Sequence, residues 1–465
     1  MSPKLRKLIA PRAFYAMVLA IVIPIIVQNA ISNFVNLLDN LMVGRVGTEQ
    51  MSGVAIANQL TFVFNLTIFG AVSGASIFSS QYHGAGNVEG VRAALRLKLY
   101  ISVIVSAIAI TLFALLGPRL VALYLNEGAD PAREQRTLEY GMSYLRIMMV
   151  GLTPFALAQS YASTLRETGE TAMPMYASIL AVLVNLVFNY FLIFGKFGFP
   201  CLGVAGAAYA TVLSRYVEFA FIAVYTHTHA KKHPFAHGLY RTLRIPLPIV
   251  RDITRKGTPL LVNELLWSGS IALLNQIYSL RGLDVVAATN ISSVVYNLFS
   301  VAFLSMGSAT AIIIGQRLGA NDIETAKDYC WKLTAFSVVI SLVFGLILFC
   351  CAGAIPHLYN TTAAVQSLAT GLIRISAALM VLHSFSHCAY FILRSGGKTG
   401  ITFLFDSGFS WVVCIPVAYV LAHFTDMPIL PLYFCVQMVD MLKALTGMLL
   451  VRSGIWIQNI VENHI

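Results

Sequence analysis

The chain has 465 residues, of which 58% are hydrophobic and only 11% are charged, and its formal net charge is +11. A soluble protein carries about 25% charged residues, so this composition excludes a water-soluble globular domain and indicates a protein whose solvent is lipid. The basic residues are spread over several short loops with no soluble domain behind them, which excludes a nucleic-acid-binding protein.

Apolar runs long enough to cross a bilayer follow one another along the chain. They predict an all-α polytopic membrane protein with twelve transmembrane helices in two pseudo-symmetric six-helix lobes. We expect an N-terminal lobe at 1–225, a cytoplasmic linker at 226–255 and a C-terminal lobe at 256–465. The expected spans are residues 14–43, 53–80, 96–117, 140–164, 173–195, 203–225, 257–280, 286–315, 333–353, 367–393, 400–423 and 429–451.

The two halves of the chain repeat each other. Pro24–Glu89 aligns without a gap on Pro259–Glu324, and a second match joins Arg166 to Arg394. Because six helices per half is an even number, both halves enter the membrane from the same side. A parallel repeat of this kind is the signature of a transporter. The matched pairs include Pro24 with Pro259, Asn40 with Asn275, Gln81 with Gln316, Gly84 with Gly319, and Thr171 with Thr399.

The distribution of Lys and Arg predicts the orientation. Most of them fall on the side that holds both termini and the linker, so we expect a multi-pass protein of the plasma (inner) membrane with both termini in the cytoplasm. The linker also holds four histidines, which we expect to be solvated, and a short amphipathic helix near Arg241–Arg255. The seven cysteines show no C-x-x-C spacing and predict no metal site or disulfide.

Polar side chains inside the spans of the first half are the best candidates for a site. A charged side chain in hydrocarbon costs about 2.5–3.5 kcal/mol on insertion scales, so it persists where it pairs or faces water. Asn36 and Asp39 share a helix face, as do Asn185 and Asn189, and Thr211 lies at a comparable depth. These groups predict an ion-binding cavity; the alternative is an interhelical hydrogen-bond cluster with no transport role.

Two acids of the second half, Glu264 and Asp406, are expected at a shared depth nearer the cytoplasm. They predict either a substrate-cation or second ion site, or a brace of the cytoplasmic gate through Arg394 or Lys398.

Other embedded charges are expected to neutralise each other within one helix. Arg215 with Glu218, and Asp440 with Lys443, are each spaced i, i+3.

Six short motifs carry a family resemblance when they are taken in this order. They are V-G-R-V-G (43–47), S-S-Q-Y-H-G-A-G-N (79–87), L-R-E-T-G-E-T (165–171), V-N-L-V-F-N-Y (184–190), G-V-A-G-A-A-Y-A-T (203–211) and G-Q-R-L-G-A-N-D (315–322). With them, the chain resembles a multidrug and toxic compound extrusion (MATE) transporter over essentially its whole length.

The resemblance implies an antiporter that exports organic cations, drugs or toxic metabolites against entering H+ or Na+ by alternating access. It implies that Asp39 is the family's first-helix acid and that Pro24 bends that helix. Asn185 matches the family's fifth-helix Asn, Asn189 falls where some members carry Asp, and Thr211 matches a sixth-helix Thr.

The second half departs from this pattern. Leu274 occupies the position that is repeat-equivalent to Asp39, and Glu264 matches the family's acids on that helix by region only.

Two other functions are weighed against transport of drugs. A flippase for a lipid-linked saccharide would favour a cavity rich in Arg and Lys, and here the embedded basic residues are few. A membrane-embedded enzyme is not expected, because the sequence has no H-E-x-x-H, G-x-S-x-G or complete phosphate-binding loop. We expect no cofactor besides H+ or Na+ as coupling ion, a small and cationic substrate, the bilayer as surroundings, and no obligatory protein partner.

Overall fold

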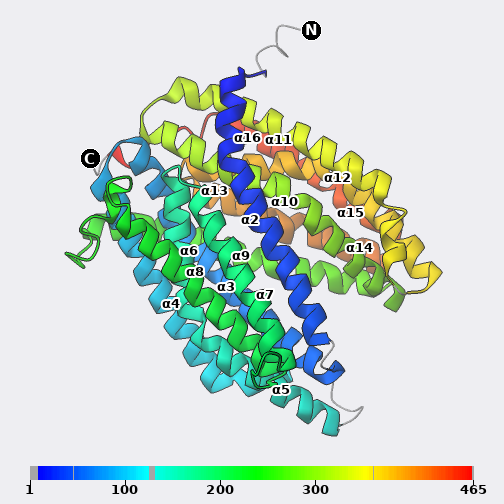
Figure 1. The fold of residues 1–465 in the computed structure, drawn as a ribbon. Coiled ribbons are helices and arrows are strands. Elements are labelled where there is room, and N and C mark those ends of the chain that lie inside the picture. Colours follow the sequence, from blue (N-terminus) through cyan, green and yellow to red (C-terminus); the bar gives the residue numbers. More distant parts are fainter. Residues whose placement is uncertain (1–8, 45–46, 125–130, 360, 463–465) are drawn as a thin grey trace. The chain divides into compact units, whose positions relative to one another are not determined.

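The computed structural model describes residues 9–44, 47–124, 131–359 and 361–462, except for the side chains of residues 35–41, 44, 48 and 131. Every element in these ranges is helical and none is a strand, which confirms the predicted all-α class (Figure 1). The first half contains α2 (Arg12–Gly44), α3 (Thr48–Gly84), α4 (Val88–Ala122), α5 (Pro131–Val150), α6 (Leu152–Glu167), α7 (Ala172–Phe194) and α8 (Val204–Thr228).

The second half continues with the same succession of long helices. Its elements are η1 (Pro234–Ala236), α9 (Leu247–Ser279), α10 (Leu283–Gly319), α11 (Ile323–Cys351), η2 (Ile355–Leu358), α12 (Ala363–Ser395), α13 (Thr399–Phe403), η3 (Leu404–Gly408), η4 (Ser410–Cys414), α14 (Ile415–Phe424), α15 (Ile429–Met438) and α16 (Asp440–Arg452).

The predicted spans correspond to these helices. Within the described residues, ten helical stretches are long and apolar enough to cross a membrane, and α5 with α6 forms an eleventh that is bent by 48°. The twelfth is α9, which is 33 residues long but carries more polar and charged groups. The twelve-helix layout is therefore confirmed.

The bend in the fourth span lies at Gly151, between α5 and α6. The Gly151 carbonyl accepts a hydrogen bond from Arg215 Nη1 of α8 at 3.4 Å. A Cβ on Gly151 would lie 3.1 Å from Val212 and 3.2 Å from Arg215, so α8 packs closely against the break. The Arg215 side chain of α8 thus donates a hydrogen bond to a backbone carbonyl at the point where the hydrogen bonds of the helix are interrupted.

The eleventh span is not a regular α-helix. Between α13 and α14 the backbone forms two π-helical segments, η3 and η4. π-helical turns are rare and often lie at functional sites. Asp406 lies in η3, so this irregular backbone determines where its carboxylate points.

The chain forms two compact units. One comprises the chain up to Ile26, Ser80–Gly86 and the chain from Arg255 onward, and the other comprises Val27–Ser79 and Asn87–Thr254. The helix α2 passes from the first unit to the second between Ile26 and Val27, and α3 enters the first unit at its last residues. The lobe limits at 225 and 256, which come from the sequence repeat, stay a prediction.

In the first unit, the ends of α3 and α10 cross through two repeat-equivalent glycines. A Cβ on Gly84 would lie 1.9 Å from the Gln316 carbonyl oxygen, and one on Gly319 would lie 1.9 Å from the Gln81 carbonyl oxygen. Real Cβ atoms do not approach oxygen so closely, so only glycine permits this crossing. The two copies of the sequence repeat therefore contact each other here, through equivalent residues of α3 and α10.

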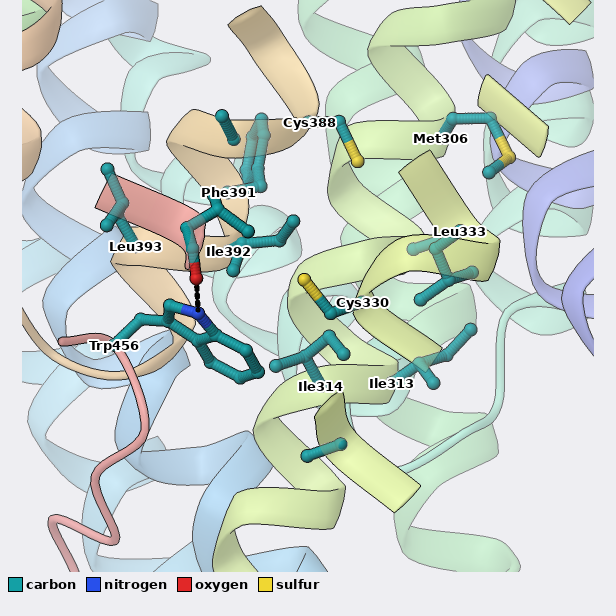
Figure 2. Close-up of a cluster of buried hydrophobic side chains, with 14 of the residues drawn as sticks. Met306, Ile313, Ile314, Cys330, Leu333, Cys388, Phe391, Ile392, Leu393 and Trp456 are labelled. Atoms are coloured by element: carbon teal, nitrogen blue, oxygen red, sulfur yellow. Dashed lines mark hydrogen bonds between the residues drawn. The ribbon is translucent and has the colours of Figure 1, made fainter. Parts of the chain in front are cut away.

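The main core of this unit lies beside that crossing. Figure 2 shows Cys330, Leu333, Cys388 and Ile392 among its apolar side chains. Trp456 is buried with them, and its indole Nε1–H donates to the Val451 carbonyl at 2.9 Å. All seven cysteines are free, and three of them are buried.

The linker is held against α4 by hydrogen bonds. The predicted helix near Arg241–Arg255 is wrong in its start, because α9 begins at Leu247 and runs on as one helix. Arg96 of α4 is buried and donates to the carbonyls of Leu239 at 2.8 Å and Gly238 at 3.1 Å. Arg96, one of the residues behind the predicted orientation, therefore also holds the linker.

The linker histidines were expected to be solvated, and for two of them this is wrong. His233 is buried beside Phe235, and burial lowers its pKa below the ordinary histidine range. His227 Nε2 lies 3.0 Å from the hydroxyl of Tyr161, and its ring stacks on Tyr240. No group of three metal-type side chains gathers in the described part of the chain.

Replacing Gly319 by Ala should weaken the α3–α10 crossing. The new methyl would force the backbones apart, and overpacking of this kind costs about 1–3 kcal/mol. We expect a lower midpoint of thermal unfolding in detergent, measured by size-exclusion after heating. Gly400→Ala is the control, because its Cβ would meet nothing within 4 Å; equal midpoints for the two variants would contradict the close crossing.

Replacing Arg96 by Ala should release the linker. Two carbonyls lose their charged donor, so trypsin should cut at Arg241 and Arg244 several-fold faster than in the unchanged protein. Limited proteolysis followed by mass spectrometry measures this. Arg251→Ala, an exposed change on α9, is the control; the same cleavage rate in both variants would show that Arg96 does not restrain the segment.

Candidate functional site

Three of the predicted site residues of the first half lie together. Asn189 Nδ2 donates to Asn185 Oδ1 at 3.0 Å along α7, and Asn185 Nδ2 donates to Thr211 Oγ1 of α8 at 3.2 Å. Both asparagines are buried. Their grouping follows from i, i+4 spacing and from the packing of α7 on α8, whereas their part in ion binding stays a prediction.

The other predicted residues of this half lie on α2. The helix runs through Asn36 and Asp39, but their side chains lie outside the described part of the structure, so their distance from Asn185 stays a prediction. Pro24 lies within α2, which continues as a helix on both sides of it.

A second group of hydrogen-bonded polar side chains in the same unit was not predicted from the sequence; we call it a polar line. Arg166 Nη1 donates to Gln28 Oε1 at 3.0 Å, and Gln28 Nε2 donates to Ser178 Oγ at 2.8 Å. The Ser178 hydroxyl in turn donates to Glu218 Oε1 at 2.7 Å. The line therefore joins α2, α6, α7 and α8 through side chains that each have a partner.

The second half has its polar centre at Asp406. Its Oδ1 accepts from Lys443 Nζ of α16 at 2.6 Å, and its Oδ2 accepts from Asn263 Nδ2 of α9 at 3.0 Å. Asn263 also receives the Ser407 backbone N–H on its Oδ1 at 3.2 Å and the Ser407 hydroxyl on its own carbonyl at 2.7 Å. Asn263 thus binds the π-helical segment that carries Asp406.

Glu264 lies next to this centre. Tyr390 of α12 donates its hydroxyl to Glu264 Oε1 at 3.3 Å, and Asn263 Nδ2 lies 3.4 Å from the same hydroxyl. Arg394 lies within electrostatic reach of the Glu264 carboxylate. The two acids that the sequence placed at one depth are therefore brought together through Asn263 and Tyr390.

The predicted pairing of Asp440 with Lys443 is wrong. Lys443 forms its ion pair with Asp406, and Asp440 Oδ2 lies 3.1 Å from His383 Nε2 of α12. His383 Nδ1 lies 2.7 Å from the Tyr296 hydroxyl. Asp440 and Lys443 therefore each pair with a residue of another element.

The two polar centres are built at repeat-equivalent positions. Asn263 aligns with Gln28, Asp406 with Ser178, and Arg394 with Arg166. The repeat alignment is therefore the signal that would have drawn attention to Gln28 and Asn263. The chemistry differs, because an uncharged serine in one half corresponds to a carboxylate in the other.

The comparisons with known proteins decide the family. The MatE family model matches residues 24–191 and 259–420. The chain belongs to the MatE family. It is therefore a member of the multidrug and toxic compound extrusion transporters, as the motifs suggested, and the two matched stretches begin at the repeat-equivalent prolines Pro24 and Pro259.

Relatives of this MatE protein match it over nearly their whole length. It is 26% identical to the "Probable multidrug resistance protein YoeA" of Bacillus subtilis, over 88% of this chain and 87% of that one. The structure of an outward-facing multidrug resistance MATE family transporter of the MOP superfamily has a TM-score of 0.84 at 20% identity and covers 97% of this chain and 98% of that one.

A third match is a MOP superfamily transporter from Pyrococcus furiosus, described by the words "reverse polarity of binding pocket suggests different function". Its TM-score is 0.82 at 21% identity, with 94% of this chain and 95% of that one covered. At these identities the structural matches show the fold.

Replacing Asn263 by Ala should destabilise this MatE protein. The change removes a donor from the Asp406 carboxylate and an acceptor from the Ser407 N–H, and each hydrogen bond to a charged or buried group is worth about 1–3 kcal/mol. We expect a clearly lower midpoint of thermal unfolding in detergent. Asn290→Ala, at an exposed position of α10, is the control; if both variants unfold at the midpoint of the unchanged protein, Asn263 does not hold η3.

Proposed function

We propose that this MatE protein is a secondary active antiporter that exports organic cations, drugs or toxic metabolites in exchange for H+ or Na+. It acts by alternating access in the plasma (inner) membrane with both termini in the cytoplasm. Family membership and a relative named as a probable multidrug resistance protein support drug export. An ion gradient is the proposed energy source, because the sequence has no complete nucleotide-phosphate loop.

The observation that carries this proposal is the pair of acids inside the membrane-spanning helices of the second half. Glu264 and Asp406 are linked through Asn263 and Tyr390 and are both only partly buried. Ionisable groups at this depth are expensive and persist where they bind ions, protons or substrates. Two carboxylates that lie this close together can hold a cationic ligand.

The proposed coupling step uses the first half. H+ or Na+ binds Asp39, with Asn36, Asn185, Asn189 and Thr211 as polar neighbours, and neutralisation lowers the cost of burying that carboxylate. The helix α2 then bends at Pro24. Each ligand can shift the balance between outward-open and inward-open states only by its difference in affinity for the two.

Replacing Asp39 by Asn should abolish coupled export. Without an ionisable group the proposed site holds no exchangeable charge, so efflux of a fluorescent organic cation from reconstituted vesicles should fall to the level of empty vesicles. Efflux is measured under a pH gradient and, separately, under a Na+ gradient, and the gradient that drives it names the coupling ion. Glu324→Gln, a carboxylate with 87% of its side chain exposed, is the control.

Two outcomes would overturn the proposal. Normal export by Asp39→Asn would remove Asp39 from the coupling step. No cation export by the unchanged protein under either gradient would favour the flippase of a lipid-linked saccharide, and translocation of such a lipid in the same vesicles then tests that alternative.

A further inference from the structure

The contacts of Lys443 distinguish it from a lysine with a purely structural part. Lys98 in the other unit is fully buried, and its ammonium donates to Ser163 Oγ at 3.0 Å, to Thr164 Oγ1 at 3.1 Å and to Glu167 Oε2 at 2.5 Å. An ammonium has three donors, so Lys98 uses all of them. Lys443 has one hydrogen bond, to Asp406, with the Phe405 ring 5.6 Å away.

A second carboxylate lies close to Lys443 on its own helix. Asp440 precedes it by three residues on α16 and lies within its electrostatic reach. The four-carbon stem of lysine is flexible and its ammonium is a point charge, so it can move between acceptors that a rigid arginine fork would not exchange. If the Lys443 ammonium moves away from Asp406, Asp440 can therefore serve as its counter-charge. A buried ammonium without a counter-charge would be costly.

The charges of this cluster balance only when one of its three acids carries a proton. The described residues around Asp406 include three carboxylates, Glu264, Asp406 and Asp440, and two permanent cations, Lys443 and Arg394. With His383 and His387 neutral and all three acids ionised, the cluster is one positive charge short. A single monovalent cation would complete it.

We propose that Lys443 is a built-in cation that occupies Asp406 until an incoming monovalent cation displaces it, and that it thereby sets the cation affinity of the second half. The incoming cation is drawn by the missing charge and takes the Asp406 carboxylate, which Asn263 holds in place. The Lys443 ammonium moves toward Asp440. This inference rests on the proposed export of cations, and it assigns to Lys443 a part in choosing and releasing them.

The charge count leads to a reciprocal pair of expectations. Lys443→Gln leaves the cluster two charges short, so the affinity for a monovalent cation should rise. Asp406→Asn leaves it balanced, so the affinity should fall. The double variant lacks the carboxylate that receives the cation, so it should not keep the gain of Lys443→Gln. Because a unit charge at about 4 Å is worth several kcal/mol even at an effective dielectric constant of 20, we expect each single change to shift Kd at least about tenfold.

The experiment measures binding of tetraphenylphosphonium to the full-length protein in detergent by equilibrium dialysis. A parallel series replaces KCl by NaCl at constant ionic strength and follows the thermal midpoint, which separates an organic cation from Na+ as the ligand. Lys443→Arg keeps the charge and should not bind more tightly than the unchanged protein. Lys327→Gln, an exposed lysine on α11, is the control.

The proposal is overturned if a folded Lys443→Gln protein shows no gain in affinity, or if the double variant keeps the gain. Should Lys443→Gln fail to fold, Asp406→Asn decides, because unchanged affinity in that variant contradicts the charge count. A gain in Lys443→Gln supports the proposal even if the unchanged protein exports no cation. Binding by the unchanged protein without the reciprocal shifts leaves cation export standing and removes Lys443 from it.

Discussion

Lipid offers no hydrogen bonds, so every polar group within the spans must find its partner in the protein, and the structure is arranged around this constraint. Many hydroxyls return to the carbonyl four residues earlier, as Thr211 does to Ala207 at 3.0 Å. Amides and charges need partners on other helices, as Asn185 finds on α8 and Asp406 finds on α9 and α16. Each such partner ties two or more helices together at one depth.

The repeat shows how one arrangement of helices can carry two chemistries. Gln28 and Asn263 occupy equivalent positions, and each holds the residue that faces it, Ser178 in one half and Asp406 in the other. The backbone differs together with the side chain: the segment around Ser178 is a regular α-helix, whereas the segment around Asp406 is π-helical. The duplication therefore kept the hydrogen-bonded frame while the charge at its centre diverged.

The long spans could be predicted from the sequence, because apolar length alone decides them. The grouping of Asn185, Asn189 and Thr211 could also be predicted, since i, i+4 spacing and depth along a helix are local properties. The partner of Lys443 could not be predicted, because the i, i+3 spacing relates only residues of the same helix, and Asp406 lies on another element. The contact of Arg96 with the linker could not be predicted for a similar reason, because its acceptors on Gly238 and Leu239 become its neighbours only after folding.

The two polar centres also differ in their balance of charge among the described residues, which bears on where a cation would bind. Around Ser178 the carboxylate of Glu218 stands against two arginines, Arg166 and Arg215, so that centre has a surplus of positive charge among the described residues. Around Asp406 the surplus is negative when all three acids are ionised. This difference is the electrostatic reason for placing the proposed cation site in the second half. In the first half a cation would depend on Asp39, the acid on α2, to outweigh the arginines, and that demand suits a small coupling ion better than a bulky substrate.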